Sequence, residues 1–167
     1  DAWRGHDRLR PLSKEGRRQA DSLARLLARL TTGELVSSPY ERCLQTVQPL
    51  SSVLRQPVRE DERLGEAMGF EGALALLAEL PDGSVLCSHG DVIPEVMRAL
   101  ERRGLEVRGA PDYRKGATWV IERIEGTADA TETFIGHAPA PGARDTDGLG
   151  LTAAPLESAL AVDAEEG

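Results

Sequence analysis

Two short apolar segments that each lead directly into an amphipathic helical pattern constrain the fold of this chain most. Glu34–Ser38 is followed by a helical pattern that ends near Leu54, and Ser84–Ser88 by one that runs from Asp91 to about Arg103. The compact apolar character of Ser84–Ser88 is typical of a central strand in a parallel sheet. This alternation predicts an α/β fold, a three-layer α/β/α arrangement around a mostly parallel central sheet.

The alternation of strands and helices continues over most of the chain and ends near residue 137. Ser13 is placed to cap a helix that runs to about Leu30. Further segments are predicted as an extended piece (Pro57–Arg59), a helix (Phe70–Leu80) and two strands (Ala117–Ile124 and Ala130–Gly136). Residues 138–167 lack periodicity and carry six acidic residues against one arginine. We therefore expect one domain over residues 1–137 and an acidic disordered tail over residues 138–167.

Composition narrows the range of functions. The chain has 167 residues, a net charge of −8 and 40% apolar residues, and it holds no apolar run long enough to span a membrane. No secretory leader is visible, and Cys43 and Cys87 are expected to be reduced thiols, so we expect a cytoplasmic protein. Residues 1–30 carry a charge of +4, which favours a local anion site over a nucleic-acid surface.

Two turns at the carboxyl ends of predicted strands hold the residues best suited to chemistry. In open α/β sheets, ligands bind outside this edge of the sheet. Arg42 lies in the first turn of the helix after Pro39, where free backbone N–H groups and a guanidinium suit phosphoryl oxygens. His89 follows a buried strand and precedes Gly90, which permits a sharp turn. Taken singly, Arg42 is also compatible with an exposed surface arginine, and His89 with a histidine that only makes structural hydrogen bonds.

Three motifs in order carry a family resemblance. They are Leu12-Ser-Lys-Glu-Gly-Arg-Arg-Gln-Ala20, Ser37-Ser-Pro-Tyr-Glu-Arg-Cys-Leu-Gln-Thr46 and Ser88-His-Gly-Asp-Val92. Together they resemble the histidine phosphatase (phosphoglycerate-mutase-like) superfamily, above all its small phosphohistidine-phosphatase-like branch. The run from Trp3 to Leu12 is also similar to the phosphatase domain that some bacteria fuse to Nudix hydrolases.

The resemblance implies roles for several residues. In that family two histidines and two arginines bind the phosphoryl group, and one histidine attacks phosphorus to form phosphohistidine. By resemblance Arg42 is the second arginine, His89 the second histidine and Glu66 the general acid. Arg4 and Arg10 are implied as substrate contacts. A solvated loop glutamate is the alternative reading of Glu66, and its nearby rivals are Glu60, Glu62 and Glu71.

The nucleophile of the family has no counterpart among the motifs of this chain. It is expected in an Arg-His-Gly or Arg-His-Ala turn at the end of a central first strand, shortly before Trp3. His6 does not fit this place, because it follows Gly5 in a charged loop with no apolar strand before it. We therefore expect the first strand to be missing from residues 1–167 and the nucleophile to lie upstream of Asp1.

These observations predict a phosphatase that hydrolyses a phosphomonoester or phosphohistidine through a phosphohistidine intermediate. Its partner would be a phosphorylated small molecule or phosphoprotein, without nucleic acid or membrane. Neither a metal nor a cofactor is predicted, since three histidines and two cysteines show no ligand spacing. Two alternatives stay open: a non-catalytic phosphate- or phosphopeptide-binding module, and the phosphatase half of a Nudix-fused nucleotide hydrolase.

Overall fold

The computed structural model describes residues 3–108, 111, 113–124, 133–137 and 158–162. In chain order the elements are η1 (Asp7–Leu9), α1 (Lys14–Leu27), β1 (Leu35–Ser37), α2 (Glu41–Leu54), β2 (Val58–Glu60), η2 (Glu62–Leu64), α3 (Glu71–Glu79), β3 (Ser84–Ser88), α4 (Val92–Glu101), β4 (Glu106–Arg108), β5 (Thr118–Ile124), β6 (Thr133–His137) and β7 (Ser158–Val162).

One sheet joins all seven described strands in the order β2-β1-β3-β7-β5-β6-β4. The strands β2, β1, β3 and β7 are mutually parallel, and β4 is parallel to β6. Within the described sheet β5 alone runs against its neighbours, β7 and β6. Ser37 at the end of β1 pairs in register with Cys87 of β3, so both strands end at the same edge of the sheet. The mostly parallel α/β sheet predicted from the sequence is confirmed.

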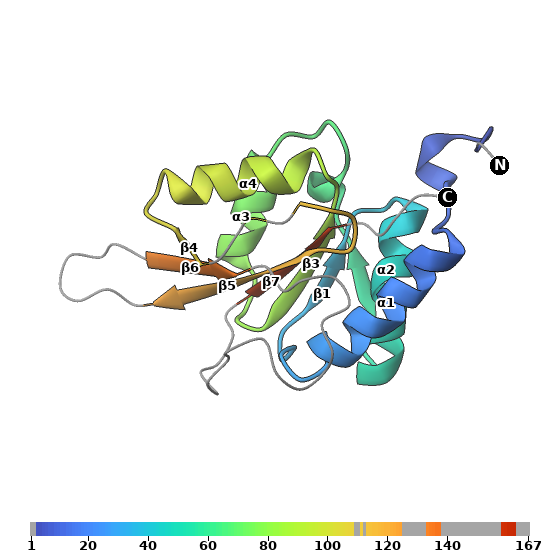
Figure 1. Ribbon diagram of the computed structural model, residues 1–167, viewed down its shortest axis with the longest axis horizontal. Coiled ribbons are helices and arrows are strands. Elements are labelled where there is room, and N and C mark those ends of the chain that lie inside the picture. Colours follow the sequence, from blue (N-terminus) through green and yellow to red (C-terminus); the bar gives the residue numbers. More distant parts are fainter. Residues whose placement is uncertain (1–2, 109–110, 112, 125–132, 138–157, 163–167) are drawn as a thin grey trace.

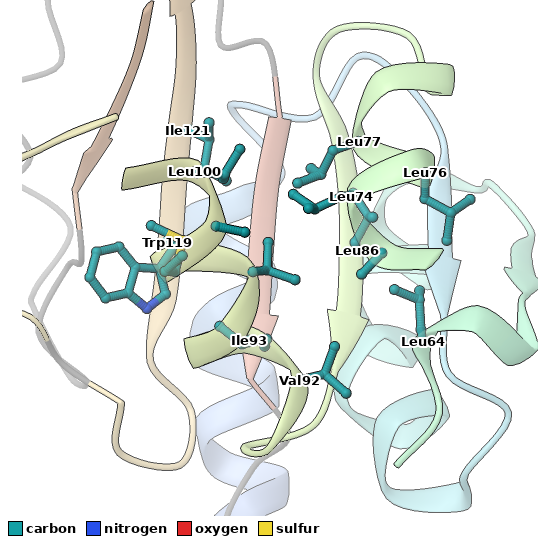
Figure 2. Close-up of a cluster of buried hydrophobic side chains, with 14 of the residues drawn as sticks. Leu64, Leu74, Leu76, Leu77, Leu86, Val92, Ile93, Leu100, Trp119 and Ile121 are labelled. Carbon is teal, nitrogen blue, oxygen red and sulfur yellow. The ribbon is translucent and has the colours of Figure 1, made fainter. Parts of the chain in front are cut away.

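Helices cover both faces of this sheet. Figure 1 shows α1 and α2 on one side and α3 and α4 on the other. The larger apolar cluster lies under α3 and α4 and includes Leu86 and the fully buried Trp119 (Figure 2). A smaller cluster under α1 and α2 includes Leu35 and Val85. Consecutive strand residues, such as Val85 and Leu86, thus point into the apolar clusters on opposite faces of the sheet, as the two-residue period of a strand requires. The predicted three-layer arrangement is confirmed.

Strand β7 corrects the expectation of a wholly disordered tail. Ser158–Val162 pairs with β3 along its whole length, from Ser84 to Ser88, and with β5 on its other side. The remainder of residues 138–167 lies outside the described residues. Without a strand here, backbone N–H and C=O groups of β3 and β5 would be unpaired in the middle of the sheet. The centre of the sheet, to which the resemblance assigns a first strand, is therefore occupied by a segment from late in the chain.

Local signals placed most element boundaries to within a few residues. Ser13 caps α1 as predicted, its Oγ accepting a hydrogen bond from Gly16 N at 2.9 Å. The next helix begins at Glu41 rather than at Pro39, with Tyr40 in the N-cap position. Strand β4 and the two 3-10 turns were not predicted from the sequence. No helix in the part of the chain described here is long and apolar enough to cross a membrane.

Candidate functional site

Arg42 is the buried centre of the candidate site. It stands in the first turn of α2 with its side chain fully buried, which is rare for an arginine unless it is paired. Its Nη2 contacts Glu66 Oε1 and lies 3.2 Å from Asp7 Oδ2, while Nη1 donates to the Asp7 carbonyl at 3.0 Å. The guanidinium also lies 4.8 Å from the centre of the Tyr40 ring. Carboxylates from two loops thus offset the cost of burying this charge.

His89 leaves β3 at the same edge and points toward Arg42. Its ring is fully buried, with Nε2 2.7 Å from Ser38 Oγ. On the other side of the ring, Nδ1 is 3.4 Å from both Arg42 Nη2 and Glu66 Oε1. The Tyr40 ring packs against it in a T-shaped arrangement, with 4.6 Å between the ring centroids. The two sequence-predicted residues, Arg42 and His89, are therefore brought together by the carboxyl ends of β1 and β3.

Glu66 is the carboxylate that connects them. Of the four glutamates considered from the sequence, it is the one whose Oε1 contacts both Arg42 and His89. Its loop follows η2 and is held by Ala67, whose backbone lies in the left-handed region at φ 59° and whose N–H donates to Asp91 Oδ2 at 2.9 Å. Its rival Glu62 instead pairs with Arg8 at 2.5 Å. Glu60 and Glu71 lie at the end of β2 and the start of α3.

Asp91 stabilises the loop that carries Glu66. It occupies the N-cap position of α4. Its side chain makes no capping hydrogen bond and accepts one from Ala67 instead. Because Ala67 adjoins Glu66, Asp91 fixes the loop that carries the carboxylate rather than the histidine.

The N-terminal loop closes the site from the other side. Arg10, expected to contact substrate, pairs with Asp7 at 2.8 Å, the residue that also pairs with Arg42. Arg4 is exposed in the loop before η1. His6 is also exposed, and its Nδ1 accepts a hydrogen bond from Arg8 N, capping η1. The sequence analysis did not identify Asp7 as a site residue. The one sequence feature that pointed to it was its place three residues before Arg10, a predicted substrate contact.

Three further neighbours of His89 stand in the motif around Arg42 but were not singled out from the sequence: Ser38, Tyr40 and Cys43. Cys43 Sγ lies 3.6 Å from His89 Nε2 and its thiol donates to the Ser88 carbonyl at 3.7 Å. Burial, reinforced by the nearby Cys87 thiol, raises the pKa of Cys43 well above its ordinary value, so it stays neutral. Within the described residues, no three His, Cys, Asp or Glu side chains gather as a metal site.

Gly90 lies in the turn after β3, and its backbone does not adopt a positive φ, so this turn does not depend on glycine for its conformation. A Cβ at this position would lie 3.6 Å from Lys115 Nζ, an ordinary van der Waals distance, so the space beside His89 would also admit a small side chain.

The arrangement is suited to binding a tetrahedral oxyanion. A guanidinium and an imidazole converge on one point at the edge of the sheet, and Glu66 Oε1 now occupies that point. Charge-assisted N–H donors of this kind are the strong hydrogen-bonding partners of phosphoryl oxygens. A carboxylate beside them can also hold or accept a proton.

Comparison with known proteins identifies the family. The model of the histidine phosphatase superfamily (branch 1) matches residues 5–74, a range that includes Asp7, Arg42 and Glu66. The chain belongs to the histidine phosphatase superfamily. A solved structure assigned as the phosphohistidine phosphatase SixA from Agrobacterium tumefaciens superposes with a TM-score of 0.53 at 25% identity, covering 59% of this chain and 69% of that one. This places the chain near the small SixA-like branch of histidine phosphatases.

Curated relatives of this histidine phosphatase chain are longer proteins. The 8-oxo-(d)GTP phosphatase of Mycolicibacterium smegmatis is 33% identical over 130 residues, which cover 74% of this chain and 40% of that protein. The phosphoenolpyruvate carboxykinase [GTP] of Arthrobacter sp. (strain FB24) matches over 58 residues at 53% identity, covering 35% of this chain and 10% of the carboxykinase. The chain therefore spans well under half the length of these two relatives.

Proposed function

We propose that this chain carries the substrate-binding half of a metal-independent phosphatase that works through a phosphohistidine intermediate. The observation that supports it most is the convergence of buried Arg42 and His89 on one point, with Glu66 between them. Family membership favours the same chemistry, and the likeness to the SixA structure favours a phosphohistidine or phosphomonoester substrate.

The proposed reaction has two steps. Phosphoryl oxygens displace the carboxylates from Arg42, and Glu66, released from the guanidinium, takes up a proton from solvent. His89 and Arg42 stabilise the negative charge of the transferring group. A histidine from a segment preceding Asp1 attacks phosphorus, so that a new P–N bond forms as the bond from phosphorus to the leaving oxygen, or to the leaving nitrogen of a phosphohistidine substrate, breaks. Glu66 gives its proton to that leaving atom. In the second step Glu66 takes a proton from water, which attacks phosphorus and releases inorganic phosphate from the histidine.

A nucleotide phosphate is the second candidate substrate. The Mycolicibacterium relative that covers 74% of this chain is an 8-oxo-(d)GTP phosphatase, which favours a nucleotide over a phosphoprotein. This candidate includes the possibility of a fused Nudix domain, and it uses the same Arg42 and His89 contacts to a terminal phosphate.

The deciding experiment begins with the gene sequence that precedes Asp1, which should encode an apolar strand ending in Arg-His. The full-length protein should then hydrolyse p-nitrophenyl phosphate, and His89→Ala should lower kcat/KM by about a hundredfold or more. The matched control is Arg18→Ala, an exposed arginine on α1, which should leave the rate unchanged. Parallel assays with a phosphohistidine peptide and 8-oxo-dGTP distinguish the two substrate classes. Binding without turnover of any of them would establish the non-catalytic module instead.

A further inference from the structure

His89 is held from both of its ring nitrogens. Ser38 Oγ lies 2.7 Å from Nε2, and both side chains are fully buried at the ends of adjacent parallel strands. The opposite nitrogen, Nδ1, faces Glu66 Oε1 and Arg42 Nη2 at 3.4 Å each. The Nδ1 edge of the ring therefore faces the candidate phosphate point, and the Nε2 edge faces the Ser38 hydroxyl, with Cys43 Sγ farther away at 3.6 Å.

The groups around Ser38 allow its hydroxyl to donate to His89 Nε2. Tyr40 N lies 3.4 Å from Ser38 Oγ and, being a backbone N–H, can only donate to it. The hydroxyl hydrogen is then available for Nε2 as acceptor. A neutral imidazole that accepts at Nε2 carries its proton on Nδ1, which points toward Glu66. An ionised carboxylate can only accept, so this tautomer gives Glu66 Oε1 a donor, whereas the opposite tautomer would leave Nδ1 to accept from Arg42 Nη2.

We propose that Ser38 is a positioning residue that keeps a proton on the pocket-facing Nδ1 of His89. This inference rests on the proposed function, in which a phosphoryl oxygen takes the place of Glu66 Oε1. The hydroxyl of Ser38 donates to Nε2 while the ring is neutral. When the ring gains a second proton beside the phosphoryl dianion, the hydroxyl rotates and accepts from Nε2–H. Nδ1–H thus faces the substrate in either protonation state.

The other neighbours of His89 are not suited to this task. Arg42 is a donor only, so it cannot accept a proton from either ring nitrogen. The thiol of Cys43 donates to the Ser88 carbonyl, and sulfur is a weak hydrogen-bonding group. Tyr40 contacts the His89 ring through a T-shaped packing of the two rings. A hydroxyl, which can both donate and accept, is the group that serves the neutral and the charged ring alike.

The test uses NMR of the chain with 15N-labelled histidine, in which long-range 1H–15N correlations identify the protonated ring nitrogen. His89 in the wild-type chain should show the Nδ1–H tautomer, and exposed His6 serves as an internal reference. Ser38→Ala should shift His89 toward a mixture of tautomers, and Ser38→Thr, which keeps the hydroxyl, should restore it. The matched control is Ser37→Ala, an equally buried serine whose Oγ donates to the Ser38 carbonyl.

The same samples are titrated with inorganic phosphate. Ser38→Ala should bind phosphate about tenfold more weakly than wild type, the effect of one lost hydrogen bond, while Ser37→Ala should match wild type. A wild-type His89 protonated only on Nε2 would overturn the proposal even if Ser38→Ala fails to fold. So would a Ser38→Ala chain with the wild-type tautomer and affinity. A third outcome separates the two proposals. If the His89 tautomer depends on Ser38 but no sample binds phosphate, the proposed function is refuted and the positioning role of Ser38 stands.

Discussion

The candidate site consists of two halves that are held in different ways. The strand-end half comprises Ser38, Arg42, Cys43 and His89, all fully buried. Ser38 and His89 directly follow β1 and β3, and Arg42 and Cys43 lie in the first turn of α2, the helix after β1. The loop half comprises the segment 7–10 and the segment 65–67. Its two carboxylates are much more exposed, Asp7 at 46% and Glu66 at 36% of the side chain.

We infer from this difference that the strand-end half is rigid, whereas the carboxylates of the loop half can be replaced by a bound anion. Strand ends are fixed by the hydrogen bonds of the sheet and by the apolar cores on both of its faces. The loop half is held to Arg42 mainly by ion pairs, and exposed carboxylates in such pairs gain little net energy. An incoming anion can therefore displace Asp7 and Glu66 without disturbing the groups that would bind it.

The largest expected effect follows from removing β7. β3, which carries His89 at its end, pairs with β7 along its whole length. A chain shortened to residues 1–157 should lose its cooperative thermal transition, followed by circular dichroism, because the central strand β3 would have an unpaired edge. A chain of residues 1–162 retains β7 and serves as the control. If the shorter chain melts cooperatively at the temperature of the control, β7 does not support the strand-end half.

Alkaline pH should weaken the strand-end half. Burial raises the pKa of the Cys43 thiol, which in the unfolded chain is about 8.5. The folded state therefore holds this proton more tightly, so the stabilisation is complete below pH ~8.5 and is lost as the pH rises above it. The free energy of unfolding should fall by up to about 1.4 kcal/mol per pH unit there. Cys43→Ala should remove this slope in urea titrations; an unchanged slope would contradict the assignment.

The same contrast explains what the sequence could and could not predict. Arg42 and His89 each follow a strand whose pattern is local, so their convergence could be anticipated from the rule for parallel sheets. The contact of Asp7 with Arg42 could not, because it depends on how a distant loop folds back over α2. β7 was missed because its five residues stand in an Ala- and Gly-rich tail, and its pairing is decided by two strands far away in the chain.

Removing the negative charge of Asp7 should strengthen anion binding. Asp7 Oδ2 lies 3.2 Å from Arg42 Nη2, where it competes with a phosphoryl oxygen. Asp7→Asn keeps the size of the side chain and should bind inorganic phosphate up to about fivefold more tightly in an NMR titration, the effect of about 1 kcal/mol. Asp21→Asn, a change of the same charge at an exposed position of α1, is the control. Weaker binding by Asp7→Asn would show that a bound anion does not replace the Asp7 carboxylate.

Acid pH should act on the loop half, with the smallest effect. Asp61 caps η2, just before the Glu66 loop, and its carboxylate accepts hydrogen bonds from Arg63 Nε at 3.0 Å and Nη2 at 2.9 Å. These bonds lower the pKa of Asp61 below its ordinary value.

The stabilisation from Asp61 is therefore present above the unfolded pKa of about 3.9 and is lost as the pH falls through the lower folded value. Asp61→Asn should cost about 1 kcal/mol or less at pH 7, because Arg63 is partly exposed, and nothing at a pH below both values. Urea unfolding at neutral and acid pH measures this difference, with the exposed Asp82→Asn as control. An equal loss at both pH values would show that the loss does not depend on the charge of Asp61 and would contradict this assignment.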